Sequence, residues 1–168
     1  MSVPLQKQEI LSQAYHDHAD ALFRYCLVKL SSRERALDAV QEVFVRVWQY
    51  LLEEKDITHM KSFLFTTAYR LIVDGYRKKK YESLDVLIED GFDIDDGNDL
   101  PLLSVDAERA LKALHTLDSE DKDIMLFRFV SGMGPKEISE ITGLSENVIS
   151  VRVHRALEKL RNTLNIHE

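Results

Sequence analysis

The sequence predicts an all-α protein in which two small helical domains are joined by a flexible acidic linker. Apolar residues recur at the three- and four-residue spacing of helices from about residue 6 to residue 81, and again after residue 104. Neither stretch alternates with the two-residue period of a strand. Residues 82–103 are instead rich in Asp and Glu, are interrupted by Gly and Pro, and show no sustained periodicity. We therefore place domains at residues 6–81 and 104–168 and a linker at residues 82–103.

Three helices are expected in the first domain. The first ends at Ser31 and Ser32, either of which can cap the second helix. The second runs to about Glu54, and the third begins near His59 and continues through the basic cluster before Tyr81. The apolar stripe expected in the first helix is Ile10, Ala14, Ala21, Leu22, Tyr25 and Leu30. The stripe expected in the second helix is Ala36, Val40, Val43, Phe44, Val47 and Leu51.

The linker is expected to form at most one short helical turn, at residues 84–88. Its Asp residues do not fit a calcium-binding loop, because with Asp93 as the first ligand Gly97 falls where the fifth ligand belongs. In the first domain His16 and Asp20 share a helical face, but both residue types are common on protein surfaces. We therefore expect no metal and no cofactor.

The second domain is expected to contain four helices and to end in a helix-turn-helix. A short helix starting at Pro135, a tight turn at Gly143-Leu144-Ser145 and a long final helix reaching about Leu164 make up this motif. Glycine suits the turn because it readily adopts a left-handed backbone. The residues expected to cap or start the four helices are Ser104, Ser119, Pro135 and Ser145.

The helix-turn-helix pattern divides its residues into two faces. The residues expected to pack inward are Ile138, Ile141, Val148, Ile149, Val153 and Leu157. Those expected to point outward from the final helix are Asn147, Ser150, Val151, His154 and Arg155. A recognition helix enters the major groove of DNA with its first turns, and several of these side chains carry donors for base edges and phosphates. A helical hairpin with a solvated face is the alternative interpretation.

The net charge of −7 and the pI of about 5.4 conceal an uneven charge distribution. Ten of the 29 acidic residues lie between residues 82 and 108 with no Lys or Arg among them, and the other 19 are outnumbered by 22 Lys and Arg. The basic clusters are residues 77–80 and the set Arg152, Arg155, Lys159 and Arg161. Two basic clusters joined by an acidic segment are compatible with nucleic-acid binding.

The composition favours a folded cytoplasmic protein. It is 45% apolar and 30% charged, and no apolar run approaches the roughly 18–20 residues needed to span a bilayer. The first nine residues lack the apolar core of a signal peptide. Cys26 is the single cysteine, which excludes an intramolecular disulfide, and its helical position predicts a buried small hydrophobe. We expect a cytoplasmic location and no insertion into a membrane.

The second helix carries a candidate docking face opposite its apolar stripe. Its members are Asp38, Gln41, Glu42, Val45 and Gln49. A polar rim around an apolar centre suits a surface that docks on a partner. Taken alone, an ordinary amphipathic surface explains this pattern better.

Residues 63–81 interleave aromatic and basic side chains. Aromatic rings can stack on unpaired bases while Lys and Arg bind phosphates, as in proteins that bind single-stranded nucleic acid. Most of the aromatic residues Phe63, Phe65, Tyr69 and Tyr76 are expected in the core. The basic run after Tyr76 is harder to explain as core.

The order of these motifs, from about Tyr15 to Leu164, resembles extracytoplasmic-function (ECF) members of the sigma-70 family of RNA polymerase sigma subunits. The segment from Asp38 to Phe44 looks like the helix by which such proteins bind the β′ clamp helices of core RNA polymerase. Residues 63–80 are similar to the part that opens and reads the −10 promoter element. Residues 117–164 resemble the domain that binds the −35 element, through the runs at residues 136–141 and 151–156.

The resemblance implies three sets of functional residues. For polymerase binding these are Asp38, Gln41, Glu42, Val45 and Trp48. For −10 DNA they are Phe63, Tyr69, Arg70, Asp74, Arg77 and Lys78. For −35 DNA they are Lys136, Asn147, Ser150, Val151, Arg152, His154 and Arg155. The implied partners are core RNA polymerase, promoter DNA and an anti-sigma factor.

The resemblance implies a sigma factor, which binds core polymerase, recognises and melts the promoter, and is not an enzyme. The sequence has no Gly-rich phosphate loop, nucleophile elbow or paired metal motif. Relatives often have Trp at Phe63 and Asn at Arg70, and a Thr-Val-Lys/Arg-Ser-Arg run where this chain has residues 148–152. The polymerase-docking role of relatives can therefore be carried over to this chain more safely than the promoter sequence that they recognise. The alternatives are a sigma-like decoy that sequesters an anti-sigma factor and an ordinary helix-turn-helix repressor.

Overall fold

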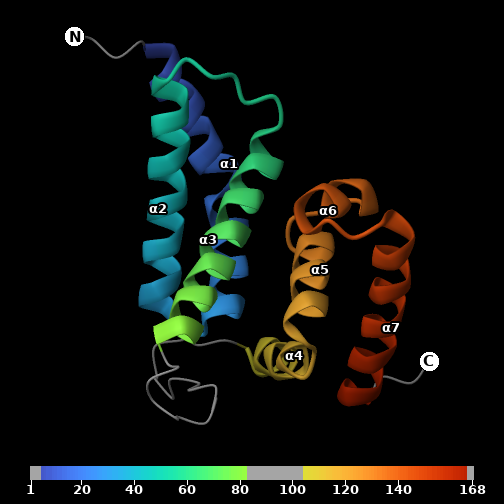
Figure 1. Cartoon of the computed structure of the whole chain (residues 1–168). Helices are drawn as coiled ribbons and strands as arrows, with labels where there is room; N and C mark the ends of the chain where they lie inside the picture. The colour runs from blue at the N-terminus through green and yellow to red at the C-terminus, as the bar shows by residue number, and fades with distance from the viewer. Residues whose placement is uncertain (1–4, 83–103, 166–168) are drawn as a thin grey trace. The chain divides into compact units, whose positions relative to one another are not determined.

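The computed structural model describes residues 5–82 and 104–165, which form seven α-helices and no strand (Figure 1). These helices divide into two compact units, the first containing α1–α3 and the second α4–α7. The predicted all-α class and the four-helix second domain are confirmed. The helical turn expected at residues 84–88 lies outside the described residues.

The first unit is a bundle of α1 (Leu5–Leu30), α2 (Arg33–Leu52) and α3 (Met60–Glu82), each packed on the other two. Ser32 caps α2, as predicted for this pair of serines, and its hydroxyl accepts a hydrogen bond from the backbone N–H of Arg35 at 3.3 Å. All six residues of the predicted α2 stripe are buried. The fully buried side chains include Leu22, Tyr25, Val43, Val47, Leu64 and Phe65.

The prediction that Ile10 belongs to the core stripe of α1 is wrong, since this side chain is 39% exposed. The neighbouring residue Leu11 is the one that lies beside α2, where it lines a groove together with Phe44 and Trp48. Ile10 is turned about 100° away from Leu11 around the helix axis and is left toward solvent.

The second unit contains α4 (Val105–His115), α5 (Ser119–Phe129), α6 (Pro135–Thr142) and α7 (Glu146–Leu164). Ser104 and Ser145 cap α4 and α7 as predicted, each accepting a hydrogen bond from a backbone N–H three residues later. The cap of α5 is Asp118, however, and not Ser119. The Asp118 carboxylate accepts from the Asp121 backbone N–H at 2.7 Å, which makes Ser119 the first helical residue.

Helices α6 and α7 form the predicted helix-turn-helix. Gly143 ends α6 with φ 78° and ψ 0°, the left-handed conformation for which glycine was expected. The Ser139 hydroxyl donates to the carbonyl of Leu144 at 2.6 Å and ties α6 to the turn. On α7, Val153 and Leu157 pack against a core cluster of Leu117, Met125 and Ala156.

One inward assignment on α7 is wrong, because Val148 is 42% exposed while Ile149 is fully buried. Consecutive residues of a helix are separated by about 100°. A buried face centred on Ile149, Val153 and Ala156 therefore leaves Val148 at its edge.

Candidate nucleic-acid and protein-docking surfaces

The predicted polymerase-binding residues of α2 lie together on one face of that helix. Asp38, Gln41, Glu42 and Val45 are exposed, Val45 to 49%, and Trp48 is half-buried one turn further on. We call these five residues the α2 docking surface. The buried stripe on the opposite side of α2 anchors the helix, so this surface is held rigidly.

Apolar residues beyond the predicted set extend the α2 docking surface. Leu37 and Leu52 are 43% and 45% exposed, respectively eight residues before and seven residues after Val45. Trp48 also opens onto a groove of about 390 Å³ lined by Gln8, Leu11, Ser12, Tyr15, Phe44 and Trp48. The Tyr15 and Phe44 rings lie 5.0 Å apart. The helical spacing of Leu37 and Leu52 from Val45 is visible in the sequence and could have predicted that they extend this surface.

The acidic part of the α2 docking surface is paired within its own helix. Glu42 accepts a hydrogen bond from Arg46 at 2.8 Å, and both side chains are about half exposed. An exposed pair of this kind contributes only about 0.3–0.5 kcal/mol. The Glu42 carboxylate can therefore exchange this partner for one on another protein at small cost.

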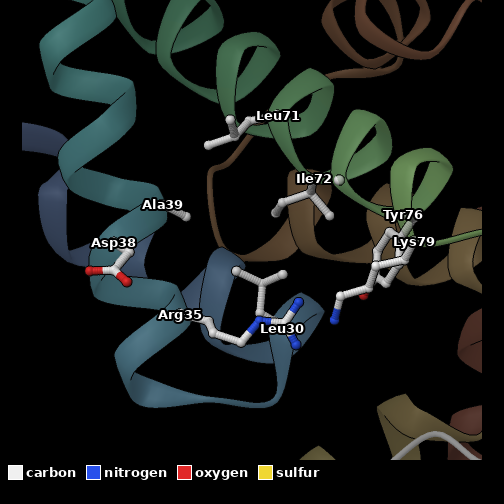
Figure 2. Close-up of a pocket in the computed structure, with 9 residues that line it drawn as sticks. Leu30, Arg35, Asp38, Ala39, Leu71, Ile72, Tyr76 and Lys79 are labelled. Carbon is white, nitrogen blue, oxygen red and sulfur yellow. The ribbon is translucent and has the colours of Figure 1, made fainter. Parts of the chain in front are cut away.

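A second cavity, of about 250 Å³, lies where the start of α2 faces the end of α3 (Figure 2). Its apolar walls are Leu30, Ala39, Leu71 and Ile72. Arg35, Lys79 and Asp38 add charges, so one residue of the α2 docking surface also lines this cavity. The Tyr76 hydroxyl donates to the carbonyl of Lys29 at 2.6 Å, which fixes one wall. At Gly75 an added Cβ would meet no atom within 4 Å.

The predicted −10 residues of α3 differ in exposure. Arg70, Asp74, Arg77 and Lys78 are exposed and follow one another at helical spacing. Phe63 and Tyr69 are half-buried. The ring of Phe63 packs on that of Tyr50 with centroids 4.8 Å apart, so only part of it is available to a base. Phe65 is buried against Tyr25, in agreement with a core role.

The residues predicted to point outward from α7 are exposed, and we call them the recognition face. Asn147, Ser150, Val151, His154 and Arg155 are all exposed, and Lys136 is exposed on α6. The Ser150 hydroxyl donates to the Glu146 carbonyl at 3.0 Å within the helix. His154 lies 3.4 Å from Glu158, one turn further along α7.

Arg152 is the exception among the predicted −35 residues. Its side chain is 30% exposed, and its guanidinium pairs with Glu120 at 2.7 Å and Asp121 at 3.0 Å. Both carboxylates lie in the first turn of α5. Burial, and then the nearby charge of Asp118, raise the pKa of Asp121, which the positive charge of Arg152 opposes.

Two other titratable groups are shifted by burial. Burial raises the pKa of the Cys26 thiol to about 12, so the thiol stays protonated at neutral pH. Burial, together with the charge of Lys122, lowers the pKa of His115.

Across residues 5–82 and 104–165, no three His, Cys, Asp or Glu side chains are grouped to hold a metal. None of the described helices is long and apolar enough to cross a membrane.

Two family models match the chain, one over each unit. The model of Sigma-70 region 2 matches residues 14–81, and the model of Sigma-70, region 4 matches residues 107–160. The ECF RNA polymerase sigma factor ShbA of Streptomyces griseus is 30% identical, over 89% of this chain and 87% of its own length. SigL of Mycobacterium tuberculosis, also an ECF sigma factor, is 26% identical over 92% of this chain and 89% of its own.

Two solved structures share the fold. The sigma factor RpoE of Bartonella quintana, in complex with the anti-sigma factor NepR, has a TM-score of 0.76 at 24% identity and covers 99% of this chain and 100% of its own. CnrH in complex with the cytosolic domain of CnrY has a TM-score of 0.68 at 22% identity, over 96% and 91% of the two chains.

Proposed function

The chain belongs to the sigma-70 family as an ECF member, and from this premise we propose how its two units engage RNA polymerase and promoter DNA. An ECF sigma factor is an alternative sigma factor that directs promoter-specific transcription. It is a transcription initiation factor and supplies binding surfaces, with the chemistry left to the polymerase. The observation that carries the proposal is the presence, on one chain, of a rigid exposed face on α2 and an exposed recognition face on α7.

The α2 docking surface binds the β′ clamp helices of core polymerase. Val45 gives it an apolar centre, and Asp38, Gln41 and Glu42 surround that centre with polar groups. Interfaces commonly combine an apolar core with a polar rim that fixes orientation. Leu37 and Leu52 lengthen the apolar contact along the helix.

The outward face of α3 binds the melted −10 element. Arg70, Arg77 and Lys78 supply positive charge for phosphates along a single strand. The half-buried rings of Phe63 and Tyr69 offer partial stacking surfaces at the same helix. Arg70 replaces the amide common in relatives, which favours a phosphate or a guanine edge as its target.

The first turns of α7 read the −35 element in the major groove. Asn147 and His154 can hydrogen-bond base edges, while Val151 cannot donate or accept but can contact a thymine methyl. Ser150 stands where relatives often carry a long cation, so at least one phosphate or guanine contact is expected to be absent. Arg155 and Lys136 supply attraction that does not depend on sequence. We expect a promoter that differs from those of relatives with the common residues.

An anti-sigma factor is the expected regulatory partner, and the cytoplasm the expected location. One of the two structures with which the chain shares its fold, RpoE of Bartonella quintana, is a sigma factor in complex with an anti-sigma factor. A partner that covers the α2 docking surface would prevent polymerase binding by occupying the same residues.

The proposal is tested by run-off transcription with purified core polymerase and the full chain. The templates carry randomised sequence upstream of a fixed transcribed region, so that the holoenzyme itself selects its promoter. We expect defined transcripts that require the added chain, with two conserved elements in the selected templates. Tight binding of an anti-sigma protein with no transcript from any template would contradict the proposal.

A further inference from the structure

Arg152 differs from its neighbours on α7 in what its side chain contacts. Its guanidinium pairs with two carboxylates of α5, Glu120 at 2.7 Å and Asp121 at 3.0 Å. Water reaches this cluster only in part, because the side chains of Arg152 and Asp121 are 30% and 23% exposed. Partly buried ion pairs are screened by salt less than exposed ones. The contact joins the recognition helix to the helix that packs beneath it.

Helical geometry also places Arg152 away from the recognition face. It follows Ile149 by three residues and precedes Ala156 by four, and both of these residues are buried. Residues at these spacings share a side of the helix. Val151, the residue before Arg152, lies about 100° away from it around the helix axis and is 47% exposed. A helix that presents Val151 to DNA therefore turns Arg152 toward the body of its own unit.

The acidic residues of α5 make a phosphate a poor competitor for Arg152. The guanidinium already has two carboxylate partners, and a phosphate approaching it would meet their negative charges. Asp118 adds a third carboxylate in the same turn, hydrogen-bonded to the Asp121 backbone N–H at 2.7 Å. If Arg152 left to bind DNA, the carboxylates of Glu120 and Asp121 would lose the guanidinium that pairs with both of them.

We infer that Arg152 is a positioning residue, which holds α7 on Glu120 and Asp121 at the angle needed for −35 readout and makes no contact with DNA. Its effect reaches the promoter through Asn147 and Val151, the residues that it holds in register. The inference rests on the proposed −35 function. It adds that Arg152 supports the recognition face and is not part of it.

The decisive test is a charge swap in the complete chain bound to core polymerase. The measured quantity is the ratio of holoenzyme affinities for a selected promoter and for the same promoter with a scrambled −35 element. Arg152→Glu should lower this ratio at least about tenfold. The triple variant Glu120→Arg, Asp121→Asn, Arg152→Glu should recover it to within about threefold, because the ion pair is rebuilt with its signs reversed. A carboxylate at position 152 repels phosphate, so a DNA-contact role allows no such recovery.

A matched pair of neutral variants gives a second readout. Arg155 is exposed, makes no ion pair within the described residues, and is proposed to face phosphate. Arg155→Gln should reduce the slope of log affinity against log salt by about 0.9, the value for one lost phosphate contact, while Arg152→Gln should leave the slope unchanged. Thermal unfolding and retained core binding show whether each variant is folded.

The inference is overturned if the folded triple variant remains as poor as Arg152→Glu, or if Arg152→Gln and Arg155→Gln reduce the salt slope equally. Failure of the proposed function has a different signature. The unmodified holoenzyme would then show no preference between the selected and scrambled promoters.

Discussion

At the scale of single residues, the exposure of Val45 on the α2 docking surface indicates a binding site only when its neighbours are considered. Val45 alone is an ordinary surface valine. Polar side chains flank it on a helix whose other side is buried, and two further exposed leucines continue the same line. The affinity for core polymerase is expected to depend on a few central residues of this face.

Glu42→Lys should weaken binding to core polymerase by about tenfold, or 1.4 kcal/mol, because it reverses a charge at the rim of the docking surface. The loss of the Arg46 pair and the new repulsion should together cost about 0.5–1 kcal/mol of stability, too little to unfold the unit. Titration of labelled core polymerase measures the affinity. Glu9→Lys, the same change at an exposed site on α1, is the control, and equal effects of the two would exclude this docking face.

The Cys26 thiol should be inert in the folded protein. Burial raises its pKa to about 12 from an ordinary value of 9.0, so the folded state holds its proton over a pH range in which the unfolded state loses it. Stability should therefore fall as pH rises above about 9, by up to about 1.4 kcal/mol per pH unit. Comparing the pH dependence of unfolding with that of Cys26→Ala isolates this contribution. Rapid labelling by a thiol reagent at pH 8 without unfolding would contradict the assignment.

At the scale of elements, periodicity predicted the helices and their buried faces because packing repeats every three to four residues. The buried α2 stripe and the Gly143 turn follow directly from this rule. What periodicity missed depends on neighbours in space. Ile10 is exposed while Leu11 lies beside α2, and Asp118 caps α5 because an extended backbone precedes Ser119.

In the candidate sites too, exposure could be predicted from helical spacing, whereas contacts between helices could not. The outward face of α7 was readable from helical spacing, since each member is exposed because of its position on the helix. The pairing of Arg152 was not readable, because Glu120 and Asp121 lie some thirty residues earlier in the chain. The packing of Phe63 on Tyr50 was likewise not readable, because the sequence does not show which residues of α2 and α3 lie side by side. Which residues contact polymerase or DNA stays a prediction.

Gly143→Ala should destabilise the second unit by about 1–2 kcal/mol, because an added Cβ is strained at φ 78°. No neighbouring atom lies within 4 Å of that Cβ, so the cost comes from the backbone alone. Gly75→Ala is the matched control. It lies in α3, also without a nearby atom, and should stabilise its helix by about 0.5–1 kcal/mol. Thermal unfolding measures both, and an unchanged melting temperature for Gly143→Ala would refute the strained turn.

At the scale of the whole molecule, two binding units on one chain make the second contact intramolecular. Once the first unit has docked, the linker sets the effective concentration of the second unit near its DNA site. The 21 residues from 83 to 103 would span about 25 Å as a free coil but can reach about 70–75 Å when extended. Promoter elements one and a half DNA turns apart are separated by about 50 Å. The segment therefore has the reach to connect both sites.

Deleting residues 87–96 should abolish the contribution of the −35 element while core binding survives. The remaining eleven residues reach only about 40 Å, less than the separation of the two sites. The test compares transcription from promoters with intact and scrambled −35 elements. Replacing the same ten residues by a Gly-Ser segment of equal length should retain the −35 effect. Retention of that effect by the deletion would show that the two units bind closer together than this account requires.

We propose that one unit melts the −10 element on polymerase while the other binds duplex −35 DNA. Footprinting of the reconstituted holoenzyme on a selected promoter tests both halves at once. Permanganate should modify thymines in the −10 element only when the chain and core polymerase are both present, and the −35 duplex should be protected from nuclease. Asn147→Ala should weaken the −35 protection without preventing assembly with core polymerase. An assembled holoenzyme that protects the −35 duplex but leaves −10 thymines unreactive, or that melts DNA without −35 protection, would contradict the account.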